Sequence, residues 1–322
     1  MDLIRKGMDL IRNGIVDRGR PFMTIEHISD NLHLIPLDLP EEGFHHFIGS
    51  WIYSLDNTFI LVDPGPRSTI PMLLQAMKEM NIGHIDYILL THIHLDHAGG
   101  LGSLLKHYQN SKVICHKKGI RHLVEPTKLW EASKKVLGDI ADLYGEPEPV
   151  PETNIDFETN ILFGSASVTV YETPGHASHH LSYKIGDMLF AGEALGIFYP
   201  MGKDTYIRIA SPPGFDIHDH KRSLFFLQDL DASVICFSHY GLSYEKEKIC
   251  DLLSAQTELW LNVIGRHSSL ASPLFEEKVL DMLLPADPGL SCFHHLPEDI
   301  KRREIYFLGN SFRGFKIALN KA

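Results

Sequence analysis

Residues 91–97 read Thr-His-Ile-His-Leu-Asp-His and place four groups that can bind a metal ion within six residues. A short apolar run, Tyr-Ile-Leu-Leu, comes directly before them and a Gly-Gly pair follows, so we expect a loop at the end of a buried strand. In an extended segment His92 and His94 point to the same side, whereas Asp96 and His97 turn toward a neighbouring point as a helix begins. Neutral imidazoles and carboxylates are ligands for zinc, iron and manganese. The stretch therefore predicts a metal site on a strand-end loop.

Strand-like and helix-like segments mix in two similar halves, about residues 22–145 and 154–241, and each half places histidines just after a strand. A mainly helical pattern begins at Tyr244. This order predicts an α/β fold built as a layered sandwich, with active residues on strand-end loops. We expect a lead-in over 1–21, a metal-binding domain over 22–243 and a mainly helical region packed on it over 244–322. We also expect an irregular insert over 199–215 and a final strand within 305–318.

Charge and cysteine content narrow the classes of function. The formal net charge of −11 argues against a nucleic-acid scaffold, which normally carries a basic surplus. The four cysteines stand alone, which predicts buried, reduced thiols rather than a disulfide framework or a thiolate zinc site. No apolar run approaches the ~18 residues that span a bilayer, and the first residues lack a signal-peptide pattern. We expect a cytoplasmic protein with a small-molecule substrate and no membrane or nucleic-acid partner, and we leave a homodimer open.

Five short motifs occur in an order that resembles the metallo-β-lactamase-fold superfamily. They are the HxHxDH motif at 92–97, Leu-Val-Asp-Pro-Gly at 61–65, Thr-Pro-Gly-His at 173–176, Leu-Phe-Ala-Gly-Glu-Ala-Leu at 189–195 and Phe-Ser-His-Tyr-Gly at 237–241. Segments at 115–129, 210–216 and 304–316 are similar to glyoxalase II-like, uncharacterised members. The resemblance implies a four-layer αββα sandwich with a C-terminal helical appendage.

The same resemblance implies two divalent metal ions, each zinc, iron or manganese. One would be held by His92, His94 and His176, and the other by Asp96, His97 and His239. Asp63 would orient the ligands, and Asp96 would also handle the proton when water attacks. We leave His179 and His180 out of the ligand set because the family motif uses only the histidine before them.

Glu193 stands where the family has an aspartate that bridges both metals. Glutamate is one methylene longer, so the expectation is that it stays at the metal centre but binds less symmetrically. The second metal position follows less directly from the sequence for that reason. Possible substrate contacts near the insert are Tyr199, Tyr206, Arg208 and Tyr240, with loop packing as the alternative for each.

The leading functional prediction is a hydrolase that uses a metal-activated water on an ester, thioester, lactone or phosphodiester. One alternative is a redox enzyme with a single iron, similar to persulfide dioxygenases on this fold. Another is a metal-binding regulatory module with little turnover. β-Lactam hydrolysis is not expected, because many superfamily members never act on lactams and no export signal is recognised.

Overall fold

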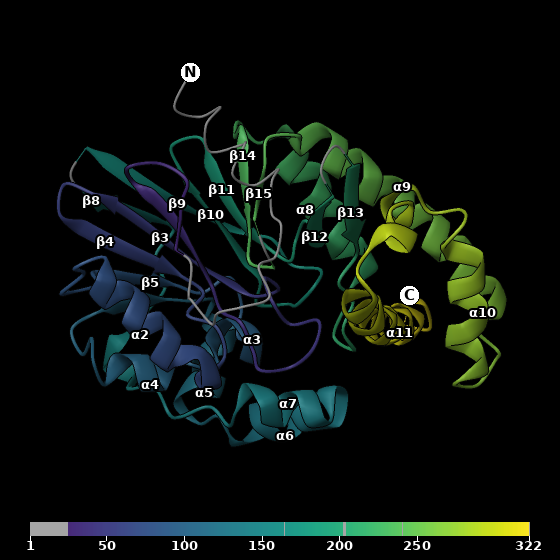
Figure 1. Ribbon diagram of the computed structural model, residues 1–322, viewed down its shortest axis with the longest axis horizontal. Coiled ribbons are helices and arrows are strands. Elements are labelled where there is room, and N and C mark those ends of the chain that lie inside the picture. The colour runs from purple at the N-terminus through teal and green to yellow at the C-terminus, as the bar shows by residue number, and fades with distance from the viewer. Residues whose placement is uncertain (1–24, 164, 202–203, 240, 322) are drawn as a thin grey trace.

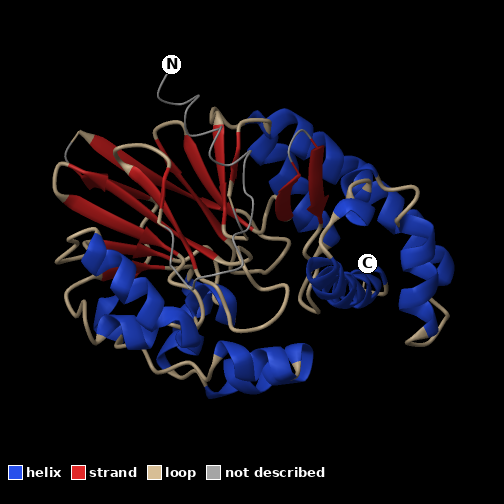
Figure 2. Cartoon of the chain, in the orientation of Figure 1, coloured by secondary structure: helices blue, strands red, loops and turns tan. Residues whose placement is uncertain are grey.

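Two β-sheets stacked face to face form the centre of the protein (Figure 1). The computed structural model describes residues 25–163, 165–201, 204–239 and 241–321. The lead-in 1–21 and Tyr240 lie outside the described residues. Figure 2 shows helices on both outer sides of the paired sheets, so four layers follow one another. The layered α/β sandwich expected from the sequence is confirmed.

The first sheet carries the segment that precedes the histidine motif. Its strand order in the described chain is the order of the sequence: β1 (Glu26–His27), β2 (Leu32–Pro36), β3 (Gly49–Leu55), β4 (Thr58–Val62), β5 (Tyr87–Leu89), β6 (Lys112–Ile114) and β7 (Ile155–Asp156). The pairs from β1 to β4 are antiparallel, whereas β4, β5, β6 and β7 run parallel. Parallel strands end at the same edge, which gathers the loops after β4 and β5.

The second sheet supplies the later histidines. Its order is β15 (Leu242–Ser243), β14 (Val234–Phe237), β11 (Met188–Gly192), β10 (Leu181–Ile185), β9 (Ala166–Glu172) and β8 (Asn160–Phe163). β11 and β14 are parallel to each other. β9 and β11 each pair antiparallel to β10, so β9 runs in the same direction as β11 and β14. The carboxyl ends of these three strands therefore share one edge.

Helices cover the outer face of each sheet. Those on the first sheet are η1 (Arg67–Thr69), α2 (Ile70–Glu79), α3 (Leu95–Ala98), α4 (Leu101–Leu105), α5 (Lys117–Val124), α6 (Thr127–Leu137) and α7 (Asp139–Tyr144). A short turn, η2 (Glu152–Asn154), leads into β7. Those on the second sheet are α8 (Ile217–Asp229), α9 (Lys246–His267), α10 (Leu274–Leu283), η3 (Pro288–Leu290), η4 (Phe293–His295) and α11 (Glu298–Leu319).

Successive side chains of each strand point to opposite faces of its sheet, and this alternation divides the hydrophobic core into three clusters. In β3, Trp51 faces the space between the sheets, while the next residue, Ile52, faces the helices of the first layer. In β14, Cys236 joins the cluster between the sheets, while Phe237 packs beneath the C-terminal helices. Strands buried on both faces in this way fix the register, because a one-residue slip would exchange the two faces. One outer cluster extends from β11 to α11, so the C-terminal helices share a core with the second sheet.

Two local predictions were wrong. The insert expected to be irregular contains an antiparallel hairpin, β12 (Ile197–Met201) and β13 (Asp204–Arg208). The final strand expected within 305–318 is instead part of α11. In both cases tertiary packing decides: the hairpin and α11 bury apolar side chains in the same cluster. Across the described ranges, the helices are too short or too polar to cross a membrane.

Candidate metal centre

Five strand-end loops meet at the edge where the parallel strands of both sheets finish. The loop after β4 carries Asp63 and the loop after β5 carries residues 91–97. From the second sheet, β9, β11 and β14 are followed by His176, Glu193 and His239. Side chains far apart in the sequence are thereby brought together by the topology rather than by any one element.

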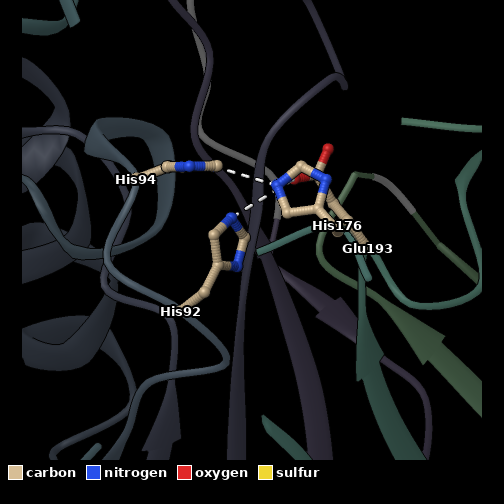
Figure 3. Close-up of side chains that lie close together, drawn as sticks. All are labelled: His92, His94, His176 and Glu193. Atoms are coloured by element: carbon tan, nitrogen blue, oxygen red, sulfur yellow. Dashed lines mark hydrogen bonds and ion pairs between the residues drawn. The ribbon is translucent and has the colours of Figure 1, made fainter. Parts of the chain in front are cut away.

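The first group consists of His92, His94, His176 and Glu193, each of which offers one ligand atom within 4.8 Å of the others. His94 Nδ1 lies 2.9 Å from His176 Nε2. Figure 3 shows the rings of His92 and His94 pointing toward the His176–Glu193 pair. His94 is half-buried, whereas the other three are buried. The three histidines predicted for one metal position are thus adjacent.

The second group consists of Asp96, His97 and His239, whose ligand atoms also lie within 4.8 Å of one another. Asp96 Oδ2 is 3.5 Å from His239 Nε2 and 3.8 Å from His97 Nε2. Asp96 and His97 belong to the single turn of α3, so both side chains leave the chain close to the end of β5. These are the three residues predicted for the other metal position.

Glu193 lies between the two groups. Its Oε2 is 2.7 Å from His176 Nε2 and 3.2 Å from His92 Nε2, while its Oε1 is 3.4 Å from His239 Nε2. Oε2 is also 3.7 Å from His97 Nε2. Oε2 therefore faces the first group and also His97, while Oε1 faces His239, so Glu193 lies between the two groups as expected of a residue that replaces the bridging aspartate.

The Nδ1 atoms of the buried histidines are anchored, so their Nε2 atoms face the centre. His176 Nδ1 donates to the Ala210 carbonyl at 2.9 Å, and His239 Nδ1 donates to the Phe47 carbonyl at 3.1 Å. Because a carbonyl can only accept, Nδ1 must carry the proton in both rings. The Nε2 lone pair is then available for a ligand bond.

Asp63 anchors the remaining part of the cluster. Its Oδ2 accepts from His97 Nδ1 at 3.0 Å, from the Thr91 hydroxyl at 2.7 Å and from the Ser238 hydroxyl at 2.8 Å. The Thr91 hydroxyl, 3.0 Å from His92 Nδ1, thereby has its proton committed to Asp63 and accepts from that ring. The structure places Asp63 where an orienting role requires it. Thr91 and Ser238 were not identified from the sequence.

His180, which is not in the predicted ligand set, forms a hydrogen bond with the backbone of Glu193. Its Nε2 accepts a hydrogen bond from the Glu193 backbone N–H at 3.1 Å, and its Nδ1 lies 2.9 Å from the Thr173 hydroxyl. Gly192 has a φ of 54°, and a Cβ there would lie 2.5 Å from His180 Nε2. A glycine is therefore required for His180 to approach this backbone.

The electrostatic environment of the first group favours neutral histidines, which can bind a cation. Burial lowers the pKa of His92 well below 6.5, and the nearby His97 and His94 lower it further. Burial and then the neighbouring His176 lower the pKa of His94 to about 3. Both rings are therefore neutral near pH 7, which is the state that binds a metal.

The second group attracts positive charge. Burial opposes ionisation of Asp96, yet His97 and His239 hold its pKa at about 2. Burial likewise lowers the pKa of His239, but contacts with Asp96 and Glu193 raise it to about 9. Without another cation the carboxylates therefore keep a proton on His239, and a metal ion would compete for that place.

These residues fit the metal ions that the fold implies. His92 Nε2 and His97 Nε2 are buried and have no hydrogen-bond partner among the described residues. A buried nitrogen without a partner is costly, by about 1–3 kcal/mol, unless a ligand compensates it. Imidazole and carboxylate donors in two adjacent sets match borderline divalent metals such as zinc, iron and manganese.

The four residues predicted to contact substrate lie in different surroundings. Tyr206 and Arg208 are 1% and 2% exposed, and both are held by the buried carboxylate of Glu304, at 2.9 and 2.5 Å. The Tyr206 hydroxyl and the Arg208 guanidinium therefore take part in an internal ion-pair network, and their contact with substrate stays a prediction. Tyr199 is half-buried in β12, and its contact with substrate stays a prediction. Tyr240 lies outside the described residues.

A chain of contacts links α11 to the second group and was not foreseen from the sequence. The Arg303 guanidinium lies 3.9 Å from the centre of the Phe47 ring, and that ring lies 4.5 Å from the ring of His239. Arg303 is fixed in turn by Glu304 at 3.0 Å and by the Gly43 carbonyl. The C-terminal helix therefore supports His239 through Phe47.

Comparison with known proteins yields consistent matches. A family model described as the metallo-beta-lactamase superfamily matches residues 47–239. A metallo-beta-lactamase fold-containing protein of Sulfurisphaera tokodaii is 34% identical over 242 residues, which are 72% of this chain and 87% of that protein. A hydroxyacylglutathione hydrolase of Aeromonas salmonicida is 27% identical over 196 residues, 60% of this chain and 61% of that enzyme. The crystal structure of an archaeal superfamily protein from Sulfolobus tokodaii has a TM-score of 0.61 at 25% identity, covering 82% of this chain and 99% of that one.

Proposed function

Because the chain belongs to the metallo-beta-lactamase superfamily, we propose that it is a metal-dependent hydrolase of an ester, thioester, lactone or phosphodiester. The observation that carries the proposal is the cluster itself. Seven side chains of ligand type converge at one edge of the sandwich, and two buried imidazole nitrogens there lack a hydrogen-bond partner among the described residues. The match to a hydroxyacylglutathione hydrolase supports a thioester as one member of the substrate class to test.

Two divalent ions held by these residues would supply a nucleophile from water at neutral pH and positive charge against the developing negative charge of the substrate. The protein contributes the placement. Anchored Nδ1 atoms fix the ring of each buried histidine, and Glu193 presents one oxygen to each set. Such fixed orientation keeps the donor atoms from reorganising during the reaction.

Asp96 is the carboxylate best placed to handle a proton. Its side chain is 17% exposed, compared with 8% for Glu193. A proton accepted on this side of the cluster can pass to solvent, whereas one accepted by Glu193 would be enclosed by histidines. Asp96 therefore combines the predicted ligand role with a route for proton release.

The alternative of a redox enzyme with a single iron would use one ligand set. The position of Glu193 between both sets supports the two-metal proposal instead. We also propose a cytoplasmic location and a small-molecule substrate. The four cysteines are free and buried, as is typical of a reducing compartment.

Metal analysis joined to a substrate panel tests the proposal. Protein purified without chelators is expected to contain a transition metal and to hydrolyse at least one of the four substrate classes. His92→Ala should lose most of the metal and reduce kcat/KM by more than the ~10–100-fold typical of losing an outer partner of a ligand. His107→Ala, at an exposed position outside the cluster, is the matched control. Metal-free wild type, or equal metal content in both variants, would refute the proposal.

A further inference from the structure

Tyr144 stands out among the buried polar groups that the site described above does not use. It is the last residue of α7 and is 1% exposed. Its hydroxyl is buried and has no hydrogen-bond partner among the described residues. Buried tyrosine hydroxyls usually find a partner, because leaving one unpaired is costly. A partner absent from the structure would explain the exception.

The helix that carries Tyr144 lies beside the turn that carries two of the ligand-type residues. α7 packs against α3, the single turn that carries Asp96 and His97. Figure 1 shows the two helices as neighbours at the end of the first sheet. Tyr144 also belongs to the hydrophobic cluster that contains Leu95 and Ala98, the residues on either side of that pair. The ring is thus held by the same core that holds the ligand turn.

The electrostatic surroundings of Tyr144 agree with that position. Burial raises the pKa of its phenol well above 10.0, and the charges of Asp96 and Glu193 raise it further. The field of the two ligand-type carboxylates therefore reaches the hydroxyl. Since the phenol stays protonated at physiological pH, it can donate a hydrogen bond within the field of these carboxylates.

We propose that Tyr144 contacts the substrate and donates a hydrogen bond to its carbonyl or phosphoryl oxygen during hydrolysis. The donor is neutral, so it stabilises negative charge that develops on this oxygen without repelling a metal ion. It also acts from the first-sheet side of the centre, whereas Glu193 and His239 act from the second sheet. The inference deepens the proposed hydrolase function and rests on it.

Tyr144→Phe, in the metal-loaded protein, tests the contact. This change removes only the hydroxyl, so metal content should stay the same and the thermal midpoint should not fall. kcat should fall by about 100-fold, as for loss of one donor to a developing oxyanion. Tyr108→Phe is the matched control: its hydroxyl already donates to the Ile82 carbonyl at 3.2 Å. That variant should lower the thermal midpoint and leave kcat unchanged.

A binding measurement separates failure of this inference from failure of the proposed function. If wild type hydrolyses no member of the substrate panel, the proposed hydrolase function is wrong. Titration calorimetry with inorganic phosphate then tests whether the Tyr144 hydroxyl contacts a bound oxyanion. The inference then requires Tyr144→Phe to bind phosphate at least ~10-fold more weakly than metal-loaded wild type. Unchanged kcat and KM, equal phosphate affinity, absence of phosphate binding by wild type, or loss of metal in the variant would each overturn it.

Discussion

Replacing Glu304 with glutamine is expected to destabilise the fold strongly, because this carboxylate is fully buried between two arginines. Its Oε2 accepts from Arg208 at 2.5 Å and from the Tyr206 hydroxyl at 2.9 Å, and its Oε1 accepts from Arg303 at 3.0 and 3.1 Å. Glutamine is neutral and offers one oxygen in place of two. The substitution therefore leaves buried guanidinium charge without an anion.

The magnitude follows from two independent considerations. Burial disfavours ionised Glu304, but Arg208 and Arg303 lower its pKa from 4.5 to about 2. At about 1.4 kcal/mol per pKa unit, this corresponds to ~3 kcal/mol of stabilisation. Removing one partner from a buried ion pair typically costs about 3–5 kcal/mol. Since folded proteins are stable by only about 5–15 kcal/mol, Glu304→Gln should lose a large share of the total.

The effect should depend on pH in a defined direction. A carboxylate whose pKa is lower in the folded state contributes its full stabilisation above its unfolded pKa, here near 4.5. That contribution is lost as the pH falls toward 2, where folded Glu304 takes up a proton. The difference in unfolding free energy between wild type and Glu304→Gln should therefore be largest near neutral pH and shrink below pH 4.5.

Urea unfolding of both proteins at several pH values between 3 and 7 measures this difference. Other acidic groups titrate in the same range, but they are common to both proteins and cancel in the comparison. Glu298→Gln, an exposed position on the same helix, is the control and should change little. A Glu304→Gln difference that is small at pH 7, or equal at every pH, would refute the assignment of a buried, ionised Glu304.

Two further predictions concern the metal centre. Glu193→Ala should lower the metal content by about one ion per chain, whereas Glu193→Asp should retain both ions, because Glu193 presents an oxygen to each histidine set. Elemental analysis of the three proteins decides, and identical stoichiometry would remove Glu193 from the ligand set. Phe47→Leu should weaken binding of the second metal by ~10-fold or more without affecting the first, because the ring packs on His239. Metal titration checks this, and equal weakening of both positions would contradict it.

The resemblance to the superfamily joined the motif after β5 to the isolated His176 and His239, which spacing along the sequence does not do. The fold brings these residues together because each follows a strand that ends at the same edge. Supporting residues were missed because their partners are distant in the sequence. Phe47 looks like an ordinary core aromatic until the fold brings its ring against that of His239.

The C-terminal helix was mispredicted for a local reason. Its sequence contains aromatic residues, which favour a strand, and two glycines, which weaken a helix. Packing reverses the preference: at Gly314 a Cβ would lie 1.8 Å from the Ser211 carbonyl oxygen. The glycine allows close approach between α11 and the chain before α8. A weak helix propensity is therefore outweighed by the burial of neighbours such as Phe312 and Phe315.

The shared core of the second sheet and the C-terminal helices has a consequence for biosynthesis. During translation β11, β14 and His239 leave the ribosome before α9, α10 and α11 exist to cover them. The first sheet and its helices can form as a unit, whereas the outer face of the second sheet stays exposed to chaperones until α11 docks. We therefore expect the loop with His92, His94, Asp96 and His97, which belongs to the first sheet, to form early on the nascent chain, and His239 to gain its support from Arg303 only in the last stage of folding.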